Sequence, residues 1–255
     1  MEDLTTIVGI MQMWLLVALC ELLDDPGELE PEVSDIRWRL FLVGEDDRPA
    51  APVTGLADLV WEDDPVDAGV RPVRQTEARA AAATAGSCQS MNEQELTELF
   101  RKLGADDPEG WARSQIGEGI PQLLRYLFLR QAWTKILRPD DRDWMAEICG
   151  GDSEEEEIGP AIEAVLATGA RVQDLTTVVR IMQWILLFGF CVLLDGGPVW
   201  RVDGRYMGLR ELAGVRWLLF QIDENDTPLV SIECLHESAL SMDPTGREMR
   251  PSSPA

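Results

Sequence analysis

The chain has 255 residues and is strongly acidic: 46 Asp and Glu against 22 Lys and Arg give a formal net charge of −24 at pH 7. A field of this sign repels nucleic acid and anionic membrane surfaces and attracts basic partners. Apolar residues make up 45% of the chain, which is typical of a globular protein of one large or two modest domains. We therefore predict no nucleic-acid binding and a basic protein partner; the alternative is that the charge serves solubility alone.

The cysteines and the N-terminus indicate the compartment. Five cysteines are scattered without a C-x-x-C pair, at Cys20, Cys88, Cys149, Cys191 and Cys234. An odd, scattered set argues against a disulfide framework. The acidic start Met1-Glu-Asp lacks the basic region of a signal peptide. We expect reduced thiols and a cytoplasmic protein.

An apolar segment occurs twice, at residues 3–24 and 174–195, and both copies carry Asp-Leu-Thr-Thr followed by Ile-Met-Gln. The pattern predicts two helices with Asp3 and Asp174 as N-caps. Spacing of i, i+4 and i+7 predicts a narrow polar stripe on each helix. The stripes are Thr5, Gly9 and Gln12 in the first copy and Thr176, Arg180 and Gln183 in the second.

The second segment is apolar on all sides between Gln183 and Asp195, which predicts burial all round. A membrane span needs about 20 apolar residues, so each segment is only marginally long enough. Gln12 and Glu21 interrupt the first segment, and neither has the flanking Lys/Arg cluster that orients a span. We predict two buried helices packed together in a pseudo-symmetric arrangement, with membrane association as the less favoured alternative.

A second repeated segment follows each helix, at residues 36–43 and 215–222, and both copies read Arg-Trp-x-Leu-Phe. Residues 36–72 align with 215–251 without a gap. Aromatic and β-branched residues before an Asp/Pro-rich turn predict a small β-hairpin, with residues 229–235 as the return strand of the second copy. The apolar spacing of Val33, Ile36, Leu40 and Phe41 leaves a helix as the alternative.

The residues between the two copies occur once and read as helices. Asn92 and Glu95 form a capping box, and Asp107-Pro108 has the order typical of a helix start. Further helices are predicted at residues 121–137, 144–148 and 160–168. Residues 74–91 are rich in Ala, Ser and Gly and are predicted to be a flexible linker.

These segments predict a mainly α (α+β) fold, and they divide the chain into the following parts. Residues 1–73 form a first repeat copy, an extra half-unit that docks on the rest; 74–91 form the linker. Residues 92–251 form a complete unit, in which single-copy helices 92–171 precede the second repeat copy 172–251, and 252–255 form a tail. Exchange of the half-unit between two chains would instead give a homodimer.

Candidate chemistry is sparse. The only histidine, His236, precedes Glu237, and such a pair could act as a general base with its orienting carboxylate. No nucleophile is identified by spacing, one histidine excludes a multi-histidine metal site, and the acidic clusters lack EF-hand spacing. No glycine-rich phosphate loop occurs. We expect no metal and no cofactor, and these observations favour a protein that is not an enzyme without excluding an enzyme.

Four further residues could bind a ligand: Gln12, Gln183, Arg37 and Arg216, together with His236. A buried amide needs a partner, so each glutamine predicts either a helix–helix hydrogen bond, across the pseudo-twofold axis, or a polar anchor in a ligand pocket. Each arginine is expected to stack on a tryptophan or pair with a carboxylate. The first hypothesis is thus an acidic module, of the immunity or inhibitor type, that masks a basic partner. The alternative is a small-ligand sensor or enzyme with its pocket between the repeated helices.

Overall fold

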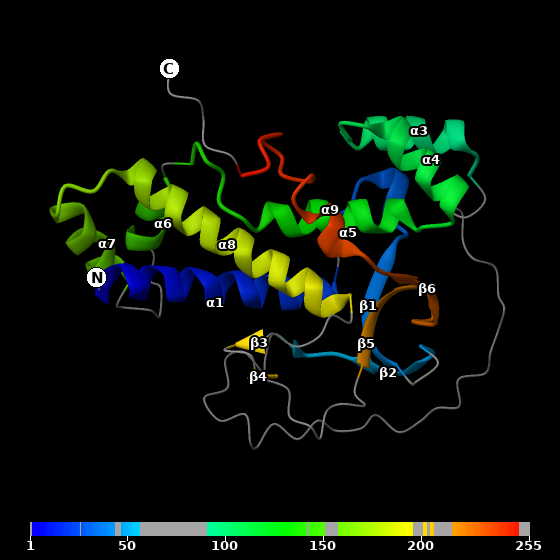
Figure 1. The fold of residues 1–255 in the computed structure, drawn as a ribbon, viewed down its shortest axis with the longest axis horizontal. Helices are drawn as coiled ribbons and strands as arrows, with labels where there is room; N and C mark the ends of the chain where they lie inside the picture. The colour runs from blue at the N-terminus through cyan, green and yellow to red at the C-terminus, as the bar shows by residue number, and fades with distance from the viewer. Residues whose placement is uncertain are drawn as a thin grey trace.

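The computed structural model describes residues 2–25, 27–43, 47–56, 91–141, 143–150, 158–195, 201–202, 205–206 and 216–249. Helices and a small antiparallel sheet make up this part of the chain (Figure 1), so the predicted α+β class is confirmed. The predicted linker at 74–91, except Met91, lies outside the described residues, as does the tail at 252–255.

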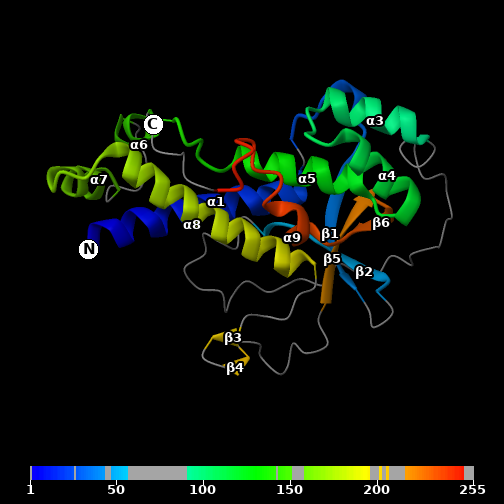
Figure 2. The ribbon, with the colours of Figure 1, turned by 45° about the horizontal axis from the view of Figure 1, so that its top comes forward.

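Two long helices form the axis of the molecule. Helix α1 spans Glu2–Asp24 and α8 spans Val172–Leu194. They lie side by side, and both run from the end near α7 towards the sheet (Figures 1 and 2). The N-cap prediction is wrong for both aspartates, because Asp3 and Asp174 lie inside the first turn. There a carboxylate still favours the positive end of the helix dipole, and Asp174 also pairs with Arg171 at 2.6 Å.

The two helices share two apolar cores. Near their N-terminal ends, Ile7 and Met11 of α1 pack in one cluster with Leu175 and Val179 of α8 and with residues of α6 (Trp144–Gly150) and α7 (Ile158–Ala167). Near their C-terminal ends, the buried leucines of both helices join a larger cluster built around α5 (Gln122–Thr134). The burial of each such side chain contributes about 1.5–3 kcal/mol, so these cores hold the long helices together.

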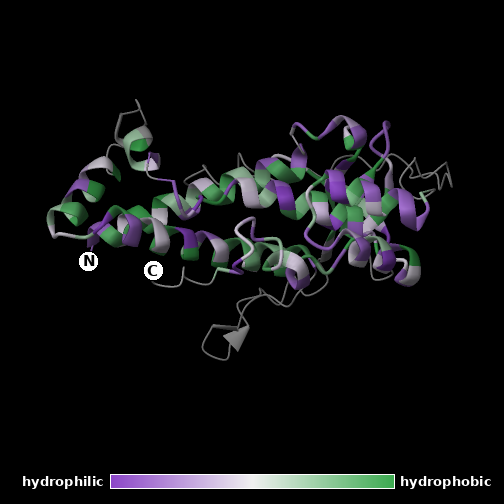
Figure 3. Cartoon of the chain, turned by 90° about the horizontal axis from the view of Figure 1, so that it is seen from above, coloured by the Kyte–Doolittle hydropathy of each residue, from purple (hydrophilic) through white to green (hydrophobic). Residues whose placement is uncertain are grey.

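The predicted burial on every side between Gln183 and Asp195 is not observed, because Ile185 is 44% exposed. Val178 and Ile181, which precede that segment, are 38% and 40% exposed and share one helix face with Ile185 at i, i+3 and i+7. Figure 3 shows the hydrophobic residues alternating with polar ones along the long helices. By length and composition alone, both α1 and α8 could cross a membrane, although 39% and 44% of their most apolar windows are buried inside the protein.

The sheet consists of two hairpins, as the repeated Arg-Trp segments predicted. β1 (Arg37–Val43) pairs with β2 (Pro49–Val53), and β5 (Arg216–Ile222) pairs with β6 (Pro228–Ile232). The strand order is β2-β1-β5-β6, and β3 (Arg201–Val202) forms a separate pair with β4 (Arg205–Tyr206). The return strand ends at Ile232 rather than residue 235, because the chain turns at Cys234 (φ 58°) into helix α9, Leu235–Ala239.

The two hairpins meet through their first strands. β1 and β5 are antiparallel, with Leu40 opposite Leu219, Arg37 opposite Ile222 and Val43 opposite Arg216. The indole of Trp38 donates to the Leu22 carbonyl at the end of α1, at 2.7 Å. The indole of Trp217 donates to the Leu193 carbonyl at the end of α8, at 2.9 Å. Each long helix is therefore fixed to its own hairpin by a tryptophan.

The single-copy helices lie at both ends of this assembly (Figure 2): α6 and α7 are near the N-terminal ends of the long helices, and the first single-copy helices are at the sheet end. A 3-10 turn, Pro31–Val33, precedes β1. Helix α3 (Glu93–Lys102) begins with the predicted capping box of Asn92 and Glu95. Helix α4 (Pro108–Glu118) begins with the predicted Asp107 cap and ends at Gly119 (φ 71°). Helix α5 lies at the centre of the larger core, where ten of its side chains are buried.

Candidate functional site

A polar groove of about 610 Å³ opens between the α3–α4 turn, α4, α5 and the segment that follows α9. Its charged lining consists of three carboxylates and one guanidinium: Asp106, Asp107, Asp243 and Arg130. Aromatic side chains form part of the wall. Trp111 is stacked on Phe100, with ring centroids 6.0 Å apart, and meets the edge of Tyr126 at 5.6 Å.

Local helix chemistry positions the acidic side of this groove. The Asp107 carboxylate accepts a hydrogen bond from the Gly110 amide at 3.0 Å, which satisfies one free donor of the first turn of α4. A Cβ on Gly110 would lie 2.1 Å from Asp107 Oδ2. Glycine at this position therefore leaves room for the carboxylate at the rim of the groove.

Gln122, in the first turn of α5, contributes an unsatisfied acceptor. Its side chain is only 7% exposed, and its amide nitrogen donates to Ser114 Oγ at 2.8 Å. Its carbonyl oxygen is buried and finds no hydrogen-bond partner in the described part of the chain. Leaving a buried acceptor unpaired costs about 1–3 kcal/mol. Sequence patterns did not reveal this residue, because its side chain is fixed by Ser114 of the preceding helix, α4.

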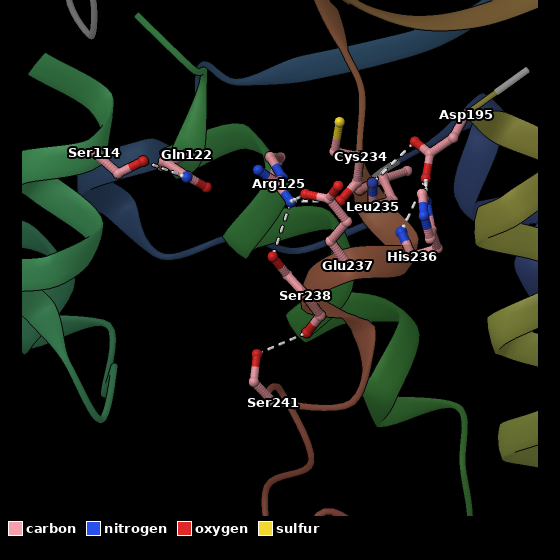
Figure 4. A network of polar contacts seen from close by, with 10 residues as sticks. All are labelled: Ser114, Gln122, Arg125, Asp195, Cys234, Leu235, His236, Glu237, Ser238 and Ser241. Carbon is pink, nitrogen blue, oxygen red and sulfur yellow. Dashed lines mark hydrogen bonds and ion pairs between the residues drawn. The ribbon is translucent and has the colours of Figure 1, made fainter. Parts of the chain in front are cut away.

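Arg125 joins α5 to the C-terminal helix α9 and lies beside the groove (Figure 4). Its guanidinium donates to the Cys234 carbonyl and, at 2.9 Å, to Ser238 Oγ. A carboxylate oxygen of Glu237 lies 3.8 Å away. The Arg125 side chain is 4% exposed, so it acts as a buried clamp that fixes the start of α9.

His236 is held by a carboxylate from the end of α8. Asp195 accepts the backbone amides of Leu235 and His236 at 2.9 Å each, and His236 Nδ1 lies 2.5 Å from Asp195 Oδ2. The imidazole also meets the edge of the Phe188 ring at 6.3 Å. Asp195 thereby caps α9 in place of Cys234, which makes no side-chain cap. The predicted orienting role of Glu237 is wrong, because the neighbouring Asp195 takes this place.

The serines near His236 point to other partners. The hydroxyl of Ser238 accepts from Arg125, and that of Ser241 donates to the Ser238 carbonyl at 3.0 Å. Within the described residues, no serine or cysteine is hydrogen-bonded to the His236 ring. The arrangement therefore lacks the nucleophile–base contact that covalent catalysis requires.

A buried ion pair closes one wall of the groove. Arg180 of α8 donates to Asp243 Oδ1 at 2.6 Å and to the Leu137 carbonyl, and its guanidinium lies 5.4 Å from the Trp133 ring. The Asp243 carboxylate also accepts from Thr245 and Met249. Burial alone raises the pKa of Asp243, but these hydrogen bonds and the Arg180 charge together bring it below its ordinary value.

The residues predicted as ligand contacts are not gathered in this groove. Gln183 is 3% exposed, and its carbonyl oxygen accepts from the Leu137 amide at 3.0 Å, so the predicted bond across the pseudo-twofold axis is not the one it makes. Gln12 is half-buried. Arg37 pairs with Asp226 of the β5–β6 turn at 3.5 Å, one of the two contacts predicted for it. The side chain of Arg216 lies outside the described part of the structure.

No group of three or more metal-ligating side chains is present among the described residues. Comparison of the chain with protein-family models, with curated proteins and with solved structures finds no match.

Proposed function

We propose that this chain is a non-enzymatic, cytoplasmic, acidic module that binds a basic protein partner, of the kind in which an immunity or inhibitor protein masks a cationic surface. The observation that carries the proposal is the charge of the groove: three carboxylates line it, against one guanidinium. The whole chain carries −24, so long-range attraction and the groove favour the same partner.

The charges within the groove are not equivalent. Asp243 is neutralised by Arg180, and Arg130 forms an ion pair with Glu30 of the segment between α1 and β1. Asp106 and Asp107 are exposed at the rim. These two carboxylates are therefore available to a cationic partner, whereas the buried pair shapes the wall.

Capture from a cell lysate tests this function. The purified chain is immobilised and washed with NaCl at about 150 mM, where the Debye length is about 8 Å. An unrelated protein of similar net charge at the same density is the control. We expect at least one basic protein to remain on the chain and to be absent from the control. Loss of every partner in this wash would contradict the proposal.

We also propose that the architecture consists of two copies of one unit, a buried helix followed by a hairpin, in a pseudo-symmetric arrangement. Three observations support this. Residues 36–72 align with 215–251 at a constant offset, and the two pairs of strands span equivalent positions. The equivalent residues Leu40 and Leu219 face each other in the β1–β5 ladder. The equivalent tryptophans, Trp38 and Trp217, bond to equivalent carbonyls of α1 and α8.

Membrane association is a second candidate, favoured by the exposed apolar face of Val178, Ile181 and Ile185 on α8. An amphipathic surface of this kind can rest in a lipid headgroup region. Flotation with neutral phosphatidylcholine vesicles tests it, since the acidic chain is repelled by anionic lipid. Ile185→Ser should then abolish flotation, whereas Ile116→Ser, which changes an exposed isoleucine on α4, should not. Absence of the wild-type chain from the floating fraction removes this candidate.

A further inference from the structure

The groove contains a feature that a merely acidic surface would lack. The Gln122 carbonyl oxygen is buried and has no hydrogen-bond partner among the described residues, and Gln122 lines the groove. Its amide is fixed by Ser114, as Figure 4 shows. A donor that reaches this oxygen from the groove would supply the missing hydrogen bond.

The aromatic wall favours a cationic donor. Trp111 is half-buried, stacks on Phe100 and makes an edge contact with Tyr126, so its ring is held in place at the groove lining before any ligand binds. The electron-rich face of an indole attracts cations, and arginine more often than lysine. A guanidinium is planar, carries five N–H donors and is weakly hydrated, so it can stack on an aromatic ring and donate at its edge.

The rim carboxylates complete the set of contacts. Asp106 and Asp107 are exposed at the groove. Oδ1 of Asp107 accepts a hydrogen bond from the Gly110 amide. Two anionic groups beside a neutral buried acceptor and an aromatic ring match the chemistry of a guanidinium, whose donors pair with carboxylates. The groove volume of about 610 Å³ exceeds that of one side chain and leaves room for neighbouring residues of a peptide.

We propose that this groove is the specific docking site for an arginine side chain of the basic partner, with Gln122 accepting from the guanidinium, Trp111 stacking on it and Asp106 balancing its charge. This inference rests on the proposed function, because it assigns the partner's contact residue. It does not involve the His236–Asp195 pair.

The test uses the full chain and a fluorescein-labelled hexa-arginine peptide, with binding followed by anisotropy in 150 mM NaCl, about physiological ionic strength. Gln122→Leu should raise the Kd about fivefold, the equivalent of one net hydrogen bond of about 1 kcal/mol. Asp106→Asn should raise it about two- to threefold. Glu118→Gln is the matched control, since it removes the same charge from an exposed position on α4 outside the groove lining, and should have a smaller effect than Asp106→Asn.

A second measurement is made on the wild-type chain, so it does not depend on the folding of Gln122→Leu or Asp106→Asn. It needs one variant, Trp111→Phe, and only to assign a signal. In nitrogen–proton spectra of the wild-type chain, the indole signal of Trp111, assigned by its loss in Trp111→Phe, should shift when hexa-arginine is added. Hexa-lysine should bind more weakly and shift it less. An unmoved Trp111 signal, equal binding of both peptides, or equal effects of Asp106→Asn and Glu118→Gln would overturn the arginine site. If basic proteins are still captured from lysate, the proposed function stands without it; if none is captured, both fail.

Discussion

The buried ion pair between Arg180 and Asp243 offers the sharpest test of how α8 is joined to the segment that follows α9. The side chains are 7% and 1% exposed, and their charged atoms lie 2.6 Å apart. Arg180→Met keeps the aliphatic stem beside Trp133, and Asp243→Asn keeps the shape of the carboxylate. Each single change leaves the other charge buried without its partner. We expect each to lower the free energy of unfolding by about 3–5 kcal/mol.

The double variant should be much less unstable than the sum of the singles. Asp243 also accepts from Thr245 and Met249, and asparagine has one acceptor oxygen in place of two, so some loss persists when the charge is gone. We expect the double variant to lose about 3–5 kcal/mol in place of the additive value of about 6–10 kcal/mol, a coupling energy of at least about 2 kcal/mol.

Urea unfolding followed by far-ultraviolet circular dichroism measures all four proteins of this cycle. The matched control is the pair Arg171–Asp174 at the start of α8, whose side chains are 78% and 55% exposed. The same substitutions there should show little coupling, because water screens exposed pairs. A coupling below about 0.5 kcal/mol at Arg180–Asp243, or one no larger than that of the control pair, would refute the assignment of this contact as a buried charge pair.

Three further predictions follow from single contacts. Trp38→Phe removes the hydrogen bond to the end of α1 and leaves a small cavity, so urea unfolding should show a loss of about 2–4 kcal/mol; an unchanged midpoint would contradict it. Burial raises the pKa of the Cys20 thiol to about 11 and also raises that of Cys191, so iodoacetamide at pH 7.5 should label neither thiol without urea, as mass spectrometry would show. The folded pKa of Asp243 is below its ordinary value of about 3.9, so its contribution to stability is present above pH 4 and lost as the pH falls through the folded pKa. The difference in urea midpoint between the wild type and Asp243→Asn should begin to shrink as the pH falls below about 4; a constant difference from pH 6 to about pH 3 would contradict this.

Local chemistry was readable from the sequence wherever partners are close along the chain. The capping box of Asn92 and Glu95 spans four residues and is formed as predicted. The hairpins were also predictable, because aromatic and β-branched residues before an Asp/Pro-rich turn indicate both strands and the reversal between them. The helical alternative for residues 36–43 does not occur, since this segment pairs with β2 and β5.

Contacts between distant parts of the chain could not be read in this way. Arg125 and Ser238 are separated by 113 residues, and Arg180 and Asp243 by 63. Helix α9 was missed for the same reason: its cap is Asp195, 40 residues before Leu235. A sequence pattern indicates that a buried arginine or amide needs a partner, but only the fold determines which one it takes.

The polar stripes of the two long helices show how similar segments acquire different roles. In α8, Thr176 accepts from the Trp144 indole at 2.9 Å, while Arg180 and Gln183 bind the Leu137 carbonyl and amide. The stripe is thus a buried polar seam that fixes the single-copy segment between α5 and α6. Its counterpart in α1 has a glycine, Gly9, in place of Arg180, and Gly9 is exposed.

The change from glycine to arginine therefore coincides with the presence of the single-copy helices beside α8. If the two helices derive from one ancestor, the arginine and Asp243 are the features that fit the second copy to its additional helices. Gly9→Arg in α1 should consequently be tolerated, because no Cβ contact lies within 4 Å of Gly9. The change should raise the unfolding midpoint slightly, since arginine has a helix propensity better than that of glycine by about 0.5–1 kcal/mol. A large loss of stability would show that this face of α1 is covered, and would place the polar stripe of the first copy in a buried contact as well.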